Sequence, residues 1–349
     1  MKKVIRLVSI IAVIVFMCLL LKYPANAATG AKNGLLLSGS IIIPTMFPFA
    51  VATLYAVKMN IFTYLKPIEK ALKIFGLSAE MFFVMILSFV GGYPLGSGLI
   101  NELYNQKRID KTQAHYMLCF CVNAGPAFII SAVGTLVLNS KKIGLVLFFS
   151  HILSSIVIMF FCSYRLRSIK IRTTEYEAFK KEKNAFSDSV ISAAESMLKI
   201  CAFVVLFSVT NSIISLFPFN DIIKSILLSL EVTNAVVRVK NIYLIAFYLG
   251  FSGINVWFQV FSMTKDCGVN LKLFVFSRFL HGALNCMIFN AIVHIFKIRV
   301  SAISNNVEIV FPQEFGFTEI SVSLIVLVLL FVICLENKNK GRKLSEDLI

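Results

Sequence analysis

The segment from residue 81 to residue 128 restricts the possible folds more than any other part of the sequence. The apolar run MFFVMILSFV leads into the glycine- and proline-rich stretch GGYPLGSG. A second short apolar arm follows this stretch. A helix needs about 20 predominantly apolar residues to span a bilayer, and each arm offers about half of that. Glycine and proline also free backbone groups that lipid cannot satisfy. We therefore predict a re-entrant hairpin over residues 81–106, with its tip at mid-membrane, buried in protein or facing a cavity.

A second interruption follows within the predicted span over residues 112–138. Asn123, Gly125 and Pro126 stand inside this otherwise apolar segment. Interrupted elements that meet near the bilayer midplane form the substrate sites of many secondary transporters. The two interruptions therefore indicate a membrane transporter.

The composition supports this class and excludes an ordinary soluble domain. Of the 349 residues, 58% are hydrophobic, and the mean hydropathy is +0.84. The net charge is +16, but the basic residues stand in short links between apolar runs. This distribution is typical of the positive-inside rule and not of a nucleic-acid-binding face. We expect the lipid bilayer as a partner and no nucleic acid.

Neither a metal site nor an enzyme active site is expected. The eight cysteines fall almost entirely within apolar segments and lack the spacing of zinc ligands, which predicts small core residues without disulfides. The sequence contains no Walker loop and no HExxH or GxSxG motif. We therefore expect no cofactor and no enzymatic activity.

The order of the apolar segments predicts an all-α polytopic membrane protein with about eight transmembrane helices and two re-entrant hairpins in an inverted repeat. The second hairpin falls at residues 221–240, and the second broken span at residues 241–263. We predict that the first helix is a retained anchor; a cleaved signal peptide is the alternative. The predicted domains are a signal-anchor helix and linker (1–33), a first repeat (34–164), a basic cytoplasmic linker (165–190), a second, inverted repeat (191–296), and a final span with a cytoplasmic tail (297–349).

The basic residues predict that both termini lie in the cytoplasm. With eight crossings and two hairpins that return to their own side, the inner segments hold 23 of the 34 Lys and Arg residues and the outer segments hold 9. An excess of Lys and Arg on cytoplasmic segments is the positive-inside pattern. This orientation also makes the two halves run in opposite directions.

The candidate substrate-binding residues are the glycines and polar side chains of the interruptions and spans. Glu231 is an acid in an apolar hairpin, which is costly and usually functional, with pairing to Arg238 as the structural alternative. Arg278 carries a planar fork that suits carboxylate oxygens, with snorkelling to the surface as the alternative. We predict that Glu231 neutralises Arg278 in the empty carrier and yields it to the substrate. The full set is Gly92, Tyr93, Pro94, Gly96, Ser97, Asn123, Gly125, Glu231, Thr233, Asn234, Ser252, Gly253, Asn255, Arg278 and His281.

Four of these residues have both a functional and a structural interpretation. Asn123 and Asn255 could donate to ligand oxygens or satisfy freed backbone groups. His281 shares a helical face with Arg278 and could carry a proton or stay a buried, hydrogen-bonded side chain. Tyr93 could stack on an aromatic substrate or pack in the core.

Five stretches, which span roughly residues 34–296, carry a family resemblance. The chain resembles the sporulation integral membrane protein YlbJ family, also called SpoVV. Its first half resembles the nucleoside-recognition Gate domain of concentrative nucleoside transporters. Glu231 matches the acid of their second hairpin, but Gly92–Leu95 lacks the acid and amide of their first hairpin tip. The stretches are GGYPLGSGLI, CVNAGPAFIISAVG, LEVTNAV, LGFSGINVWFQV and SRFLHGALN.

The resemblance implies a nucleoside-transporter-like fold and a secondary carrier for a small organic anion. For the family it implies export of dipicolinate from the mother cell across the outer forespore membrane during sporulation. A coupling proton or cation is a possible further partner, and the oligomeric state is open. Two alternatives stand beside this reading: a carrier for nucleosides or other polar metabolites, and a sporulation membrane scaffold that transports nothing.

Overall fold

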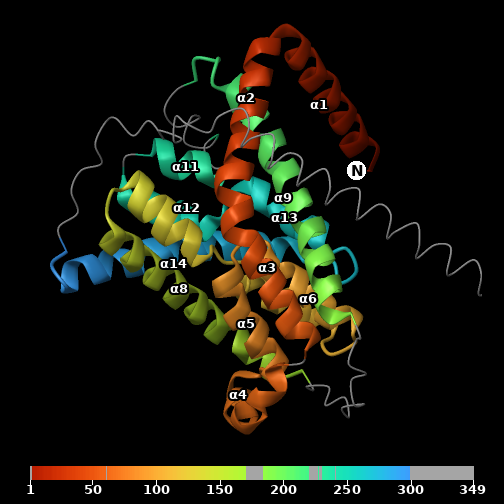
Figure 1. The fold of residues 1–349 in the computed structure, drawn as a ribbon, viewed down its shortest axis with the longest axis vertical. Helices are drawn as coiled ribbons and strands as arrows, with labels where there is room; N and C mark the ends of the chain where they lie inside the picture. Colours follow the sequence, from red (N-terminus) through yellow and green to blue (C-terminus); the bar gives the residue numbers. More distant parts are fainter. Residues whose placement is uncertain are drawn as a thin grey trace, which may run out of the picture.

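The computed structural model describes residues 2–59, 61–169, 184–219, 227, 230–239 and 241–298. Within these ranges every regular element is helical (Figure 1). The long and short helices in chain order are α1 (Lys2–Lys22), α2 (Pro24–Leu37), η1 (Ser38–Ile42), α3 (Ile43–Lys58), η2 (Ile61–Ile68), α4 (Glu69–Leu72), η3 (Lys73–Phe75), α5 (Ala79–Gly91), α6 (Leu95–Asn105), α7 (Lys111–Phe120), η4 (Ala127–Val137), α8 (Lys141–Arg167), α9 (Ala185–Ile214), α11 (Val232–Arg238), α12 (Ile242–Phe251), α13 (Gly253–Met263) and α14 (Leu271–Ile295).

Four to six of these segments are long and apolar enough to span a membrane. The four are α8, α9, the joined pair α12–α13, and α14. Two bent pairs raise the number to six: α1 with α2, bent by 100°, and the segment formed by α4 and η3 with α5, bent by 79°. The protein is therefore an all-helical membrane protein, whereas the eight crossings and the inverted repeat stay predictions. The predicted final span and most of the basic linker lie outside the described residues.

Side-chain caps explain where several helices begin. The side-chain oxygens of Ser78, Ser140, Asn241 and Asn270 accept hydrogen bonds from backbone N–H groups in the first turns of α5, α8, α12 and α14. Asp110 forms a capping box at the start of α7. These polar residues separate apolar runs in the sequence, and each one satisfies backbone groups that a helix start leaves free.

The hairpin predicted over residues 81–106 is present as two helices joined by a tight turn. α5 ends at Gly91, the chain turns through Gly92 to Pro94, and α6 leads away. Gly92 has a φ of +75°, which disfavours any residue with a side chain. The depth of this turn in the bilayer stays a prediction.

Both predicted broken spans are also interrupted. α7 ends at Phe120, and the chain resumes as the π-helix η4 only at Ala127. α12 and α13 are separated at Ser252, whose φ of +71° ends the first helix in the left-handed region. Of the second hairpin, the structure describes α11 and the residues just before it, and residues 220–226 lie outside the description.

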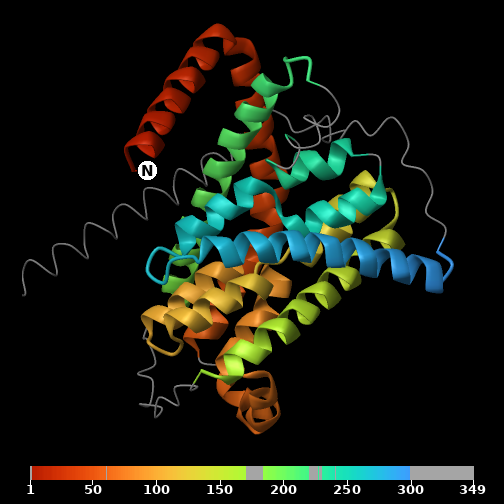
Figure 2. The same cartoon turned by 180° about the vertical axis from the view of Figure 1, so that it is seen from behind.

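The helices form two packed groups. α2 and α3 follow each other end to end, and α9 lies alongside both (Figures 1 and 2). A methyl group added at Gly30 or Gly34 of α2 would lie 2.7 Å from the α9 backbone. Small residues allow such close helix approach in membranes. In the second group α14 packs against both α12 and α8, as Figure 2 shows. The hairpin and both interruptions belong to this second group.

Candidate substrate-binding cavity

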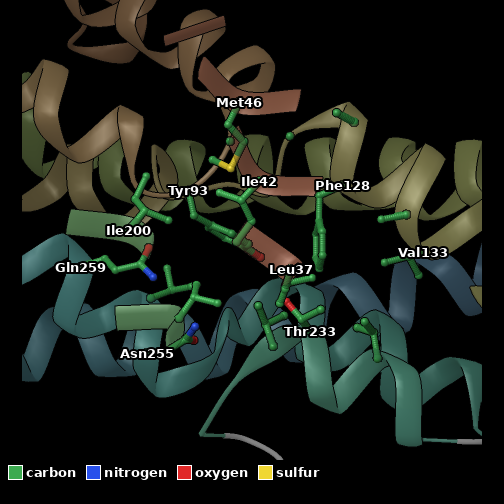
Figure 3. A pocket seen from close by; sticks show the side chains of 18 of the residues that line it. Leu37, Ile42, Met46, Tyr93, Phe128, Val133, Ile200, Thr233, Asn255 and Gln259 are labelled. Carbon is green, nitrogen blue, oxygen red and sulfur yellow. The ribbon is translucent and has the colours of Figure 1, made fainter. Parts of the chain in front are cut away.

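A cavity lies where the interrupted elements of the two halves meet. Its volume is about 960 Å³, including its open mouth. Side chains from both halves converge on it in Figure 3, where Tyr93 and Phe128 of the first half lie opposite Thr233 and Asn255 of the second. Interrupted elements from both parts of the chain therefore line one cavity in the described structure.

The walls of the cavity differ in chemistry. The α2–α3–α9 group contributes only apolar side chains: Leu37, Ile42, Met46, Phe49, Ile200 and Val204. The polar side chains of the described lining all belong to the second group: Tyr93, Glu231, Thr233, Asn255 and Gln259. A ligand would therefore be oriented by the second group and enclosed by the first.

Glu231 and Asn255 form the polar corner of the cavity. Glu231 is 1% exposed, and its Oε1 accepts hydrogen bonds from the backbone N–H of Thr233 at 2.9 Å and from Asn255 Nδ2 at 3.4 Å. The backbone N–H of Asn255 donates to the carbonyl of Leu230 at 2.9 Å. These bonds fasten the start of α11 to the start of α13. The buried Oδ1 of Asn255 has no hydrogen-bond partner in the described part of the chain.

The turn of the first hairpin touches the first interruption backbone to backbone. A Cβ at Gly92 would lie 3.0 Å from the Gly125 nitrogen, and a Cβ at Gly125 would lie 3.2 Å from the Gly92 Cα. A Cβ at Gly96 would lie 2.0 Å from the Cys121 carbonyl oxygen. The glycines predicted to shape the site therefore allow two chain segments to meet at the cavity edge.

Tyr93 connects the two halves. Its hydroxyl donates a hydrogen bond to the carbonyl of Leu249, near the end of α12 where the second interruption frees backbone groups. The side chain is 7% exposed and also lines the cavity. Tyr93 thus satisfies a backbone group of the opposite half while its ring borders the ligand space.

Buried side chains satisfy the backbone of the first interruption. Arg278, which is 0% exposed, donates from Nη1 to the Val122 carbonyl at 2.6 Å and from Nη2 to the Cys119 carbonyl. Asn123 Nδ2 donates to the Phe120 carbonyl at 2.8 Å and to Ser88 Oγ at 3.0 Å. Arg278 and Asn123 therefore serve the backbone here, and neither lines the cavity.

His281 belongs to a polar seam between α8 and α14. Its Nε2 lies 3.2 Å from the His151 carbonyl, and the two imidazole rings stack with centroids 4.5 Å apart. His151 Nε2 in turn accepts from the Ala124 N–H at 3.0 Å. One turn further along α14, Asn285 Nδ2 donates to the Ala246 carbonyl at 2.7 Å. The seam ties α14 to the interrupted segment and to α12.

The structure thus brings together part of the predicted set. Gly92, Tyr93, Gly125, Glu231, Thr233 and Asn255 line the cavity. Pro94, Gly96, Ser97, Asn123, Ser252, Gly253, Arg278 and His281 lie in the described residues but not in the lining. The side chain of Asn234 lies outside the description. No ion pair joins Glu231 to Arg278 among the described residues, so the predicted exchange between them has no contact in this state.

Several residues that the structure places at the cavity or at the first interruption are absent from the set predicted from the sequence. Gln259 follows Asn255 by one helical turn and points to the same cavity, a spacing that could have identified it. Phe128 and Met46 gave no such signal, because aromatic and Met residues recur throughout the apolar segments. His151, which is absent from the predicted set, accepts a backbone hydrogen bond from Ala124 at the first interruption.

The described residues offer no grouping of three or more His, Cys, Asp or Glu side chains that could hold a metal ion. The cysteines of the described ranges are free thiols. Polar recognition in the cavity therefore rests on carboxylate, amide and hydroxyl groups.

The described residues define a helical membrane protein with a cavity between interrupted elements. The chain is 22% identical over 313 residues to the sporulation integral membrane protein YlbJ of Bacillus subtilis (strain 168). The match covers 75% of this chain and 76% of that protein. It supports the family resemblance drawn from the motifs and leaves the Gate-domain resemblance a prediction. No family model and no solved structure matches the chain.

Proposed function

We propose that this protein is a secondary membrane carrier for a small organic anion, with dipicolinate as the candidate substrate. The observation that carries the proposal is the cavity between the interrupted elements of the two halves. Secondary transporters build their substrate sites from such elements. The similarity to a sporulation integral membrane protein supports a role in sporulation. The location that we propose, the mother-cell-derived outer forespore membrane, is what the family resemblance of the motifs implies.

The cavity suits an aromatic body with a few polar groups. Phe49, Phe128 and Tyr93 offer aromatic faces, and the remaining apolar lining would exclude water from a bound ring. A planar pyridine ring fits such walls, and the polar corner would hold one edge of it. The cavity therefore favours an aromatic acid over an aliphatic one.

The charge of the lining determines how an anion could enter. Glu231 is the acidic side chain of the described lining, and a substrate carboxylate that lies beside it meets a like charge. A dianion beside an ionised carboxylate is unfavourable at low dielectric. We therefore propose that the substrate enters together with a proton or a small cation that lies between its carboxylate and Glu231.

Uptake into vesicles that contain the purified full-length protein tests this function. Labelled dipicolinate should accumulate in preference to uridine, and faster under an inward proton gradient. Glu231→Gln should remove the response to the gradient, whereas Glu195→Gln, which changes an exposed acid of α9 outside the cavity, should keep it. Equal rates for protein-containing and empty vesicles with both substrates would favour the scaffold alternative.

A second candidate is a carrier for a nucleoside or another neutral polar metabolite. It is favoured by the acceptor character of the corner, where the Glu231 carboxylate and the partner-less Asn255 Oδ1 lie together. Sugar hydroxyl groups would donate to both oxygens. Faster uptake of uridine than of dipicolinate would select this function.

A further inference from the structure

Arg278 is a buried cation placed at the end of a half-helix. It stands in α14 with no exposed surface, and its guanidinium reaches the carbonyls of Cys119 and Val122, on either side of the point where α7 ends. Its Nε lies 3.4 Å from Ser277 Oγ, and its Cζ lies 5.4 Å from the Phe274 ring centroid. Within the described ranges, no acidic side chain forms an ion pair with it.

The charge of Arg278 is balanced by the backbone. A helix C-terminus carries a partial negative charge and free carbonyl groups, and it stabilises a cation placed against it. α7 ends inside the protein, so water cannot satisfy these carbonyls. The guanidinium supplies both the positive charge and the hydrogen-bond donors that the end of α7 needs.

Interrupted membrane helices commonly use a bound ion for the same purpose. In many transporters unwound carbonyls and half-helix C-termini coordinate Na⁺. In this chain side chains instead form hydrogen bonds with the backbone groups that the first interruption leaves without a helical partner. Arg278 takes two carbonyls, Asn123 Nδ2 and Ser155 Oγ both reach the Phe120 carbonyl, and His151 takes the Ala124 N–H.

We propose that Arg278 is a resident cation of the first interruption and takes the place of a bound alkali ion there. The first half of the protein then needs no bound Na⁺ to fold. Na⁺ has no role in holding the hairpin turn against the interruption. The proposal concerns α7 and α14 only. It does not depend on which substrate the cavity accepts, or on which ion accompanies that substrate at Glu231.

Thermal unfolding of the purified full-length protein in matched solutions of NaCl, LiCl, KCl and choline chloride tests the proposal without any substrate. Every protein compared, including the reference called wild type below, carries Glu231→Gln, so that a cation held at the cavity carboxylate cannot change the unfolding temperature. Wild-type protein should unfold at the same temperature in all four salts. Arg278→Met removes the charge at similar volume and should unfold several degrees lower in choline. Methylguanidinium, and in part Na⁺ or Li⁺, should restore the loss. Lys272→Met removes an exposed cation of the same helix and should resemble wild type in every salt.

A wild-type unfolding temperature that rises in Na⁺ over choline would overturn the proposal. So would an Arg278→Met variant that is as stable as wild type in choline, or one whose loss no cation restores, because the side chain would then act by packing alone. If Arg278→Met does not fold, Arg278→Lys provides the test. It keeps the charge but cannot span both carbonyls, so it should be less stable than wild type and equally insensitive to Na⁺. Sensitivity of this variant to Na⁺ would also contradict a resident cation.

Discussion

Gly96→Ala should destabilise the protein strongly, although alanine is the better helix former. Gly96 lies in α6, where replacing glycine by alanine in an open position gains about 1 kcal/mol. The new Cβ, however, would lie 2.0 Å from the Cys121 carbonyl oxygen and 2.8 Å from Ser88 Cβ. Both neighbours must move, and the first is backbone of the interruption that borders the cavity.

The size of the stability change follows from two opposing terms, the gain in helix propensity and the cost of overpacking. Overpacking of a filled interior costs about 1 to 3 kcal/mol, and more where backbone must shift. With an approach this close we take the upper end and subtract the propensity gain, which leaves a net loss of about 2 kcal/mol. That loss corresponds to a roughly thirtyfold change in the unfolding equilibrium, since about 1.4 kcal/mol is tenfold.

Gly98 provides a matched control on the same helix. A Cβ there would meet Met263 Sδ at 3.7 Å, which is ordinary van der Waals contact. Gly98→Ala should therefore gain about 1 kcal/mol, so the two variants should differ by about 3 kcal/mol in opposite directions. Denaturant unfolding of the purified protein in detergent micelles, followed by far-ultraviolet circular dichroism, measures the difference. If Gly96→Ala is as stable as Gly98→Ala, α6 does not pack against the interruption as described.

Two further predictions concern the surface and the orientation. Hydrogen bonds from Asn105 and Asn101 hold the pKa of Asp266, in the link between α13 and α14, below its ordinary value of 3.8. Stability from a depressed pKa is present above the ordinary value and is lost as the pH falls through the folded-state value. Wild-type protein should therefore lose thermal stability as the pH falls below about 4, and Asp266→Asn should lose less. Equal losses in the two proteins would contradict the hydrogen bonds to Asp266. Second, Glu175→Cys on a cysteine-free background should react with a membrane-impermeant maleimide only after the cells are permeabilised. Labelling from outside would contradict the cytoplasmic linker and the opposite orientation of the two halves.

Local chemistry made the breaks in the chain predictable from the sequence. Glycine and proline at residues 91–94 end one helix before the next begins, and the small and polar residues near residues 123–126 and 252–255 interrupt apolar runs. The structure interrupts its helices at each of these places. The first arm of the second hairpin, most of the linker and the final span lie outside the described residues and stay predictions.

The sequence left the partners of the buried polar groups undetermined. Arg278 and Glu231 both stood in apolar segments, so pairing them was a reasonable hypothesis from charge alone. The fold instead directs Arg278 to two carbonyls at the end of α7 and places Glu231 against Asn255 in the cavity. Which carbonyl a distant side chain reaches depends on how helices cross, and no local spacing encodes that.

The sequence by itself determined the class, a helical membrane protein with interrupted elements, because hydrophobic length and helix-breaking residues act over a few neighbours. Only the tertiary structure decided which of the freed backbone groups form hydrogen bonds with side chains and which polar groups face the cavity. Asn123 and Asn255 demonstrate the division: each lies at an interruption, yet Asn123 satisfies the Phe120 carbonyl while Asn255 faces the cavity. Buried polar groups must find partners wherever the packing brings them, so their roles depend on contacts between segments more than 20 residues apart in the chain.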